Sequence, residues 1–333
     1  MTSDIHRGSV PISVRVHGYL FPYALAMYIT SATISLAAFV YGVTLAYLQP
    51  QIWRNAIIRV LIAAQFFSSV FFVFRIMLAD VGLKTESACR VVLYMSVATS
   101  LLPVNLCVYC VVYIQLVVVY HVSPELRWPR RVTLAAAAAI SILPPSPVLF
   151  LSPRHFGRNS MCDFSFIPNS KEYAIDMYGY AAWAYLSGVV GLFSLLSVIV
   201  HMVRTRRATR HALQSSAESY GPSGAVERVG HTETFNRALV SIIWLPVTPI
   251  VSLWFNSLVI TVSYYTGELD TPLRFTTVVL FSLQSILLAL PLITNPTMRD
   301  ALAKQLREQR QARAAARSKT QISPLPPAAP AAS

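Results

Sequence analysis

Long apolar runs dominate this chain and alternate with shorter polar stretches. Each run is at least about 20 residues long, enough to cross roughly 30 Å of hydrocarbon as a helix that rises 1.5 Å per residue. The first run exceeds the ~7 to 15 apolar residues of a signal peptide, so we interpret it as a retained span. The pattern predicts an all-α membrane protein, a seven-transmembrane helix bundle, with spans near residues 20–48, 56–79, 91–120, 132–151, 178–203, 238–264 and 275–297.

The fourth run, VTLAAAAAISILPPSPVLFL, departs most from an ideal span. Alanine is only mildly apolar, and Pro144, Pro145 and Pro147 interrupt the run. Proline removes a backbone donor and clashes with the preceding turn, although kinked membrane helices tolerate it. If this run does not span, six spans remain and both termini lie on the same side of the membrane.

The polar segments complete the domain organisation. Residues 1–19 form a polar N-terminus, the bundle covers residues 20–297, and residues 204–237 form a long loop within it. Residues 298–312 combine leucines with Arg and Lys, which predicts a short amphipathic helix on the membrane interface. The Pro- and Ala-rich tail, residues 313–333, is expected to stay disordered.

Composition and charge agree with a membrane protein and predict its orientation. The chain is 55% hydrophobic and 12% charged, against about 25% charged in soluble proteins, and its net charge is +13. A positive net charge of this size is typical of proteins that bind nucleic acid or anionic lipid. Because the chain is so hydrophobic, we expect membrane lipids as partners and no nucleic acid. One set of connections holds 18 Lys and Arg and the other set 8. The positive-inside rule therefore predicts an N-terminus outside and a C-terminus in the cytoplasm.

The four cysteines fall into two pairs. Cys89 at the start of the third span and Cys162 in the loop 152–177 both lie on the predicted outer, oxidising side. We predict a disulfide between them, and two free thiols are the alternative. Cys107 and Cys110 lie inside the third span, where we interpret them as buried small hydrophobic residues.

These features together resemble a G-protein-coupled receptor: seven spans, an outer N-terminus, the two outer cysteines and an amphipathic segment after the seventh helix. In the sixth span Trp244-x-Pro246 is similar to the Cys-Trp-x-Pro element of rhodopsin-like receptors, where the proline kinks the helix and the tryptophan lies under the ligand. Pro246 and Pro249 are therefore expected to form a conformational hinge. A kinked helix with an ordinary buried tryptophan is the alternative.

The end of the seventh span carries a partial signature. Asn295-Pro296 resembles the start of the NPxxY element and joins the expected hinge residues, although Arg299 stands where tyrosine is expected. The third span ends in QLVVVYHVSPELRW, without Asp-Arg-Tyr. With SLQ at 282–284 and a basic third inner loop, the chain looks more like the fungal receptors grouped with the slime-mould cyclic-AMP receptors and a fungal glucose receptor. The resemblance implies a small extracellular ligand, a nutrient or nucleotide-like signal, and a heterotrimeric G protein as partner.

Arg59 stands at the inner end of the second span and is counted with the loop before it, and Arg75 is the only other formal charge inside a predicted span. Its guanidinium could pair with a carboxylate or phosphate of the ligand, but snorkelling to the nearby interface is the interpretation we favour. Aromatic residues supply the other candidates, and interface anchoring is their alternative role. The candidate ligand-binding residues are Arg75, Tyr94, Tyr180, Trp183 and Trp244.

Arginines gather at the predicted cytoplasmic ends of the third and fifth spans. Arg127, Arg130 and Arg131 follow the third span, and Arg206 and Arg207 follow the fifth. They are candidates for contact with a G protein or with anionic lipid. The positive-inside rule alone also explains them.

Enzyme and cofactor functions find no support in the sequence. The spans contain no paired carboxylates, no metal-ligand set and no nucleophile with a base, and residues 275–297 offer no lysine for retinal. We therefore expect no enzymatic activity, no cofactor and no metal. The alternative function is a small-molecule transporter, although the halves show no repeat and no charge at midplane.

Overall fold

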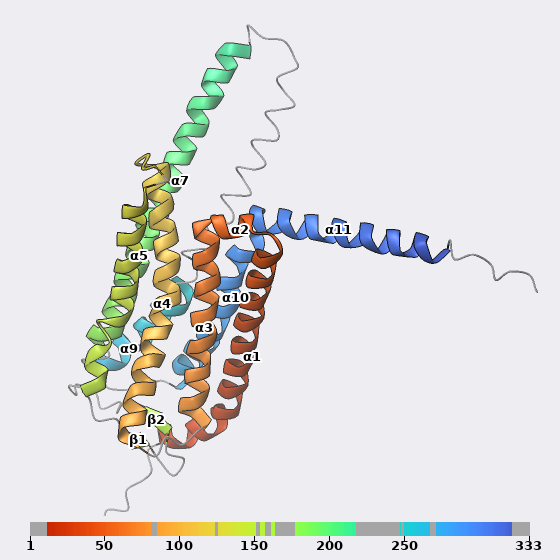
Figure 1. Cartoon of the computed structure of the whole chain (residues 1–333). Coiled ribbons are helices and arrows are strands. Elements are labelled where there is room, and N and C mark those ends of the chain that lie inside the picture. The colour runs from red at the N-terminus through yellow and green to blue at the C-terminus, as the bar shows by residue number, and fades with distance from the viewer. Residues whose placement is uncertain are drawn as a thin grey trace, which may run out of the picture.

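The chain folds into a bundle of long helices (Figure 1). The computed structural model describes residues 12–80, 85–123, 126–150, 154–156, 161–163, 177–217, 247, 250–266 and 271–321. The elements in chain order are α1 Ile12–Leu48, α2 Gln51–Arg54, α3 Ala56–Asp80, α4 Glu86–Val118, α5 Arg127–Ile142, the 3-10 turn η1 Ser146–Phe150, β1 Arg154–Phe156, β2 Met161–Asp163, the π-helical turn η2 Met177–Ala181, α7 Ala182–Ala217, the π-helical turn η4 Ile250–Trp254, α9 Phe255–Thr266, α10 Thr271–Thr294 and α11 Pro296–Gln321.

Six helices in the described part of the chain are long and apolar enough to cross a membrane. Their outward faces carry large exposed apolar side chains such as Phe66, Phe193 and Leu196. Water would penalise such faces, whereas lipid tails accept them. A helical fold with apolar helices suited to a membrane is thereby confirmed, with candidate spans Pro22–Leu48, Ala56–Leu78, Ser87–Val118, Trp128–Phe150, Tyr178–Thr205 and Phe275–Thr294.

The fourth apolar run is among these candidate spans. Its α-helix, α5, ends at Ile142, just before Pro144 and Pro145, and the chain then continues as the 3-10 turn η1. Proline cannot extend the α-helical hydrogen bonding, which explains the change of helix type. The seven-span count is not confirmed, because much of the run 238–264 lies outside the described residues.

α1 and α7 extend furthest beyond the predicted spans. α1 begins at Ile12, ahead of the predicted residue 20, and residues 1–11 lie outside the described part. α7 continues to Ala217, so the prediction that residues 204–237 form a loop is wrong for residues 204–217. Hydropathy predicts where a helix leaves the hydrocarbon of the membrane. It does not predict whether the helix then continues into water.

The helix after the last span is also longer than predicted. α11 covers Pro296–Gln321, where we expected a helix over 298–312 and a disordered tail from 313. The prediction for 313–321 is wrong because QARAAARSK consists almost entirely of strong helix formers. Residues 322–333 lie outside the described part of the chain.

Contacts between α1 and α10 show that these helices are parallel. The Ser31 hydroxyl donates to the Ser282 carbonyl at 3.0 Å, and the Ser285 hydroxyl donates to the Ser31 carbonyl at 3.0 Å. Further along both helices, Gly42 lies against Leu292. α1 and α10 therefore advance in the same direction.

α4 and α7 are parallel as well. Ser187 donates to the Asn105 side chain at 2.6 Å, and the rings of His121 and His201, both further along, lie 5.8 Å apart. Figure 1 shows α1, α4, α7 and α10 all running toward the end that carries α2 and α11, here called the α2 end, with α3 and α5 running back. The antiparallel strands β1 and β2, with His155 opposite Cys162, mark the opposite end, here called the strand end.

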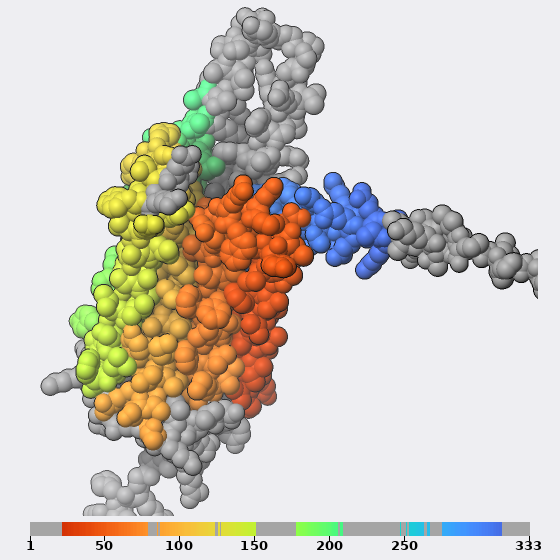
Figure 2. All heavy atoms as spheres, in the orientation of Figure 1, coloured from red at the N-terminus to blue at the C-terminus, as the bar shows by residue number. Residues whose placement is uncertain are grey.

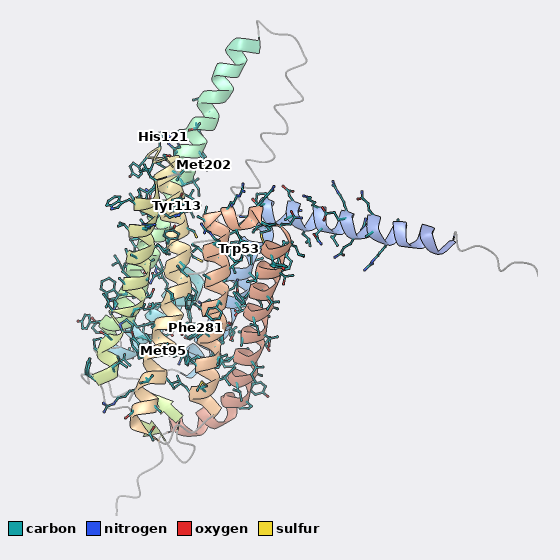
Figure 3. All side chains as sticks on the ribbon, in the orientation of Figure 1. Trp53, Met95, Tyr113, His121, Met202 and Phe281 are labelled. Carbon is teal, nitrogen blue, oxygen red and sulfur yellow. The ribbon has the colours of Figure 1, made fainter. Side chains whose placement is uncertain are left out.

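Two apolar clusters fill most of the interior. The cluster nearer the α2 end, here called the large cluster, draws Leu61, Cys110, Val198 and Leu288 from four helices. Figure 2 shows α1, α3, α4 and α5 forming one continuous face, with α11 projecting from the bundle beside α2. Phe281, labelled in Figure 3, belongs to the second cluster, nearer the strand end. This aromatic cluster consists of Phe71, Phe72, Leu101, Val104, Tyr180, Ala181, Ala184, Leu253 and Phe281.

Candidate functional site

A layer of buried polar side chains crosses the bundle between the large cluster and the aromatic cluster. On α3, for example, Gln65 and Ser68 lie between Ala64 of the large cluster and Phe71 of the aromatic cluster. Such residues are costly at the depth of lipid tails and often mark function. This polar layer consists of Ser31, Ser35, Gln65, Ser68, Asn105, Ser141, Ser187, Gln284 and Ser285, and each of them is at most 5% exposed.

In one part of the polar layer, the side chains form a continuous chain of hydrogen bonds. The Asn105 amide donates to the Ser141 hydroxyl at 2.8 Å and accepts from Ser187 at 2.6 Å. Ser141 in turn donates to the Ala137 carbonyl at 2.8 Å. Asn105 thereby links α4 to both α5 and α7.

The other part lies among α1, α3 and α10. Ser35 donates to Ser68 at 3.1 Å and joins α1 to α3, while the Ser31 bonds join α1 to α10. Gln65 and Gln284 belong to the same part and are fully buried. Among the described residues neither carboxamide has a hydrogen-bond partner.

The aromatic cluster brings together two of the predicted ligand-binding residues. Tyr180 is buried in it, and the guanidinium carbon of Arg75 lies 5.6 Å from the ring centroid of Phe71, another member. Phe71 lies one turn earlier on α3, so the charge sits beside a ring deeper in the bundle, which runs against the snorkelling that we favoured. Arg75 is half-buried, and its Nε has no hydrogen-bond partner in the described part of the chain.

An open, apolar groove lies beside the aromatic cluster. Its volume is about 450 Å³. The described residues that line it come from α7, η4, α9 and α10, namely Tyr185, Val251, Trp254, Phe255, Leu258 and Leu280. The indole of Trp254 packs directly on the backbone at Gly188 of α7.

Two π-helical turns border this region. η2 supplies Tyr180 and Ala181 to the aromatic cluster, and η4 supplies Leu253. π-helical turns are rare and often occur at functional sites. Pro246 and Pro249, the predicted hinge, lie just before η4 and outside the described residues.

Two further predicted ligand-binding residues, Tyr94 and Trp183, are not members of the aromatic cluster. The Tyr94 hydroxyl donates to the Ile142 carbonyl at 3.2 Å, and its ring packs on a separate cluster with Leu78 and Cys89 near the strand end. Trp183 is half-buried on α7. Trp244 lies outside the described residues.

Two of the cysteines, Cys107 and Cys110, are buried as predicted. Cys107 and Cys110 are buried free thiols of α4 in the large cluster. Cys89 is fully buried at the start of α4 and is not among the free thiols. β2, which carries Cys162, contacts both α3 and α4.

The predicted cytoplasmic arginines lie on helices rather than in loops. Arg127, Arg130 and Arg131 fall in the first turns of α5, and Arg206 and Arg207 lie on the part of α7 that projects past the bundle (Figure 1). A helix N-terminus disfavours positive charge, and the first turn of α5 has no acidic residue. These arginines therefore do not stabilise α5 itself.

Asn295 and Pro296 form the start of α11. The Asn295 side chain accepts from the Thr297 amide at 3.0 Å, and its carbonyl accepts from the Met298 amide at 3.1 Å. Asparagine at the N-cap with proline at the first helical position is a favoured helix start. The pair therefore separates α10 from α11, and Met298 anchors α11 in the large cluster.

Sequence reasoning missed Gln65, Asn105 and Gln284 as site residues. Each has a carboxamide side chain in the middle of an apolar run. A polar residue in such a run could have indicated a functional position. Their neighbours become visible only once the helices are packed. No family model matches the chain, and a search of curated proteins finds no significant match.

Proposed function

We propose that the protein is a seven-helix receptor of the G-protein-coupled receptor superfamily. In this proposal the strand end faces the outside, a small nutrient or nucleotide-like ligand binds near the aromatic cluster, and the α2 end engages a heterotrimeric G protein. The N-terminus is then outside and the C-terminus is in the cytoplasm of a plasma-membrane protein.

The parallel directions of α7 and α10 carry this proposal. Two consecutive membrane helices that run the same way require the chain between them to return across the bundle. The described part of that return is η4 and α9, which pack against both α7 and α10. A crossing there adds a seventh span to the six candidates, as a receptor requires.

The chemistry of the two ends supports the same orientation. Arg130 and Arg131 lie in the first turns of α5, where the helix dipole disfavours positive charge, and Arg207 lies on the extended C-terminal part of α7. A cytoplasmic leaflet or an acidic partner surface would attract this charge. At the other end, we propose that Cys89 pairs with Cys162, which the contacts of β2 with α3 and α4 support. Mass mapping of non-reduced peptides tests that pairing.

Ligand binding near the aromatic cluster would act through the packing of α7 and α9. Arg75 and Tyr180 offer a charge and a phenol there, and the two π-helical turns border the same cluster. A ligand that binds one packing of these turns more tightly than another shifts the population of bundle conformations.

A nucleotide-exchange assay tests the receptor function. The purified chain in nanodiscs is combined with G proteins and screened with sugars and nucleotides, and we expect ligand-dependent exchange. A variant with Arg130, Arg131 and Arg207 all changed to Gln is the matched control, because it should fold normally and lose coupling. Substrate flux into liposomes without exchange would instead identify a transporter.

A further inference from the structure

Gln65 of α3 and Gln284 of α10 are the two least satisfied polar side chains of the polar layer. Both are 0% exposed. In the part of the chain that the structure describes, all four of their carboxamide heteroatoms lack a hydrogen-bond partner. Buried polar groups in folded proteins are nearly always paired, with protein or with ordered water.

The two glutamines lie on facing stripes of antiparallel helices. The rings of Phe71 and Phe281 lie 5.6 Å apart toward the strand end, and Gly42 lies against both Ile62 and Leu292 toward the α2 end. Between these contacts, the register offsets Gln65 and Gln284 along the bundle axis by about one helical turn, roughly 5 Å. The two carboxamides make no direct hydrogen bond to each other, and an offset of this size suits a short bridge.

Each glutamine has a serine close to it along its own helix. Ser68 is one turn from Gln65 on α3, and Ser285 is next to Gln284 on α10. Both serines are fully buried. Serine hydroxyls leave room and offer further hydrogen-bond partners, which is what a buried water requires.

We propose that Gln65 and Gln284 bind ordered water that bridges α3 and α10 inside the bundle. Each carboxamide presents an acceptor oxygen and a donor amino group, and water satisfies both because it donates and accepts. A monovalent cation would satisfy only the two oxygens and leave the amino groups unpaired. The site needs no external ligand and no G protein, so it stands apart from the receptor proposal.

Water-edited solid-state NMR tests the site in liposomes. The full chain is labelled with ¹⁵N in glutamine and asparagine side chains, and magnetisation is transferred from mobile water to the amino groups. We expect the Gln65 and Gln284 signals to build up at mixing times similar to those at which the signal of the exposed Gln309 builds up. Asn105, whose amide is paired within the protein, is the internal dry reference.

Substitutions assign the signals and separate hydration from misfolding. Gln65→Leu should remove one signal and slow the build-up of the Gln284 signal toward that of Asn105. The double variant Gln65→Leu, Gln284→Leu should fold and melt no lower than the parent, because both polar groups leave together. Build-up at both glutamines as slow as at Asn105 would overturn the proposal. Signals that vanish when Na⁺ and K⁺ are replaced by N-methylglucamine would overturn it in favour of a cation.

Discussion

Gly188 of α7 lies directly against the indole of Trp254 at the end of η4, so closely that a Cβ on the glycine would overlap the ring. This contact joins α7 to η4, the turn that leads into α9. The packing of the indole therefore requires glycine at position 188, because the ring lies against the α7 backbone with no side chain between them.

Gly188→Ala should lower the free energy of unfolding by about 1–3 kcal/mol, the usual cost of overpacking. The indole must shift toward the groove, so tryptophan fluorescence should change together with the melting temperature in detergent. Trp254→Leu removes the obstruction, and Gly188→Ala should cost clearly less in that background. An equal cost in both backgrounds would show that the glycine matters for another reason.

The sequence predicted the helices inside the membrane better than those outside it. The second span was expected at 56–79 and α3 covers Ala56–Asp80, because hydropathy and length decide where a chain crosses hydrocarbon. The same criterion could not predict α7 as far as Ala217 or α11 as far as Gln321, because these parts are polar. Their helical form follows from local propensity instead.

The candidate site could be predicted by residue type but not by position. Arg75 and Tyr180 were chosen for their chemistry, and the structure brings both to the aromatic cluster, whereas Tyr94 packs elsewhere. The network at Asn105 joins residues 36 and 82 positions away in the chain. No local pattern specifies such partners, because they depend on how the helices pack.

Asn105 should matter for stability more than a lipid-facing polar residue does. Asn105→Leu removes two interhelical hydrogen bonds, which in membrane proteins contribute about 0.6 kcal/mol each and at most about 1.7. We expect a loss of about 1–2 kcal/mol in the free energy of unfolding, measured in a mild denaturing detergent. Thr33→Val is the matched control, since the exposed Thr33 bonds only to the Ile29 carbonyl of its own helix. Equal losses in the two variants would contradict a special role for Asn105.

The Asn295 cap should control α11 alone. Asn295→Ala should destabilise the start of α11 by about 1 kcal/mol, because Asn is a favoured N-cap and Ala is not. Amide hydrogen exchange at Thr297 and Met298 should quicken while the bundle melts as before. Asn55 accepts from the Ile57 amide at 3.0 Å in a similar cap on α3, so Asn55→Ala should lower the melting temperature of the whole bundle instead. A lower bundle melting temperature with Asn295→Ala would show that α11 is part of the cooperative core.

Arg75 should reduce stability while supporting function. A charged residue costs about 2.5–3.5 kcal/mol at the centre of a membrane helix and less nearer its end, and Arg75 is half-buried beside Phe71 with its Nε unpaired among the described residues. We therefore expect Arg75→Leu to raise the free energy of unfolding by about 1–2 kcal/mol and to abolish ligand-dependent nucleotide exchange. Arg75→Lys keeps the charge but not the bidentate geometry, so it should weaken the response without the gain in stability. If Arg75→Leu melts lower than the parent, the guanidinium stabilises the bundle, and its role is structural rather than ligand binding.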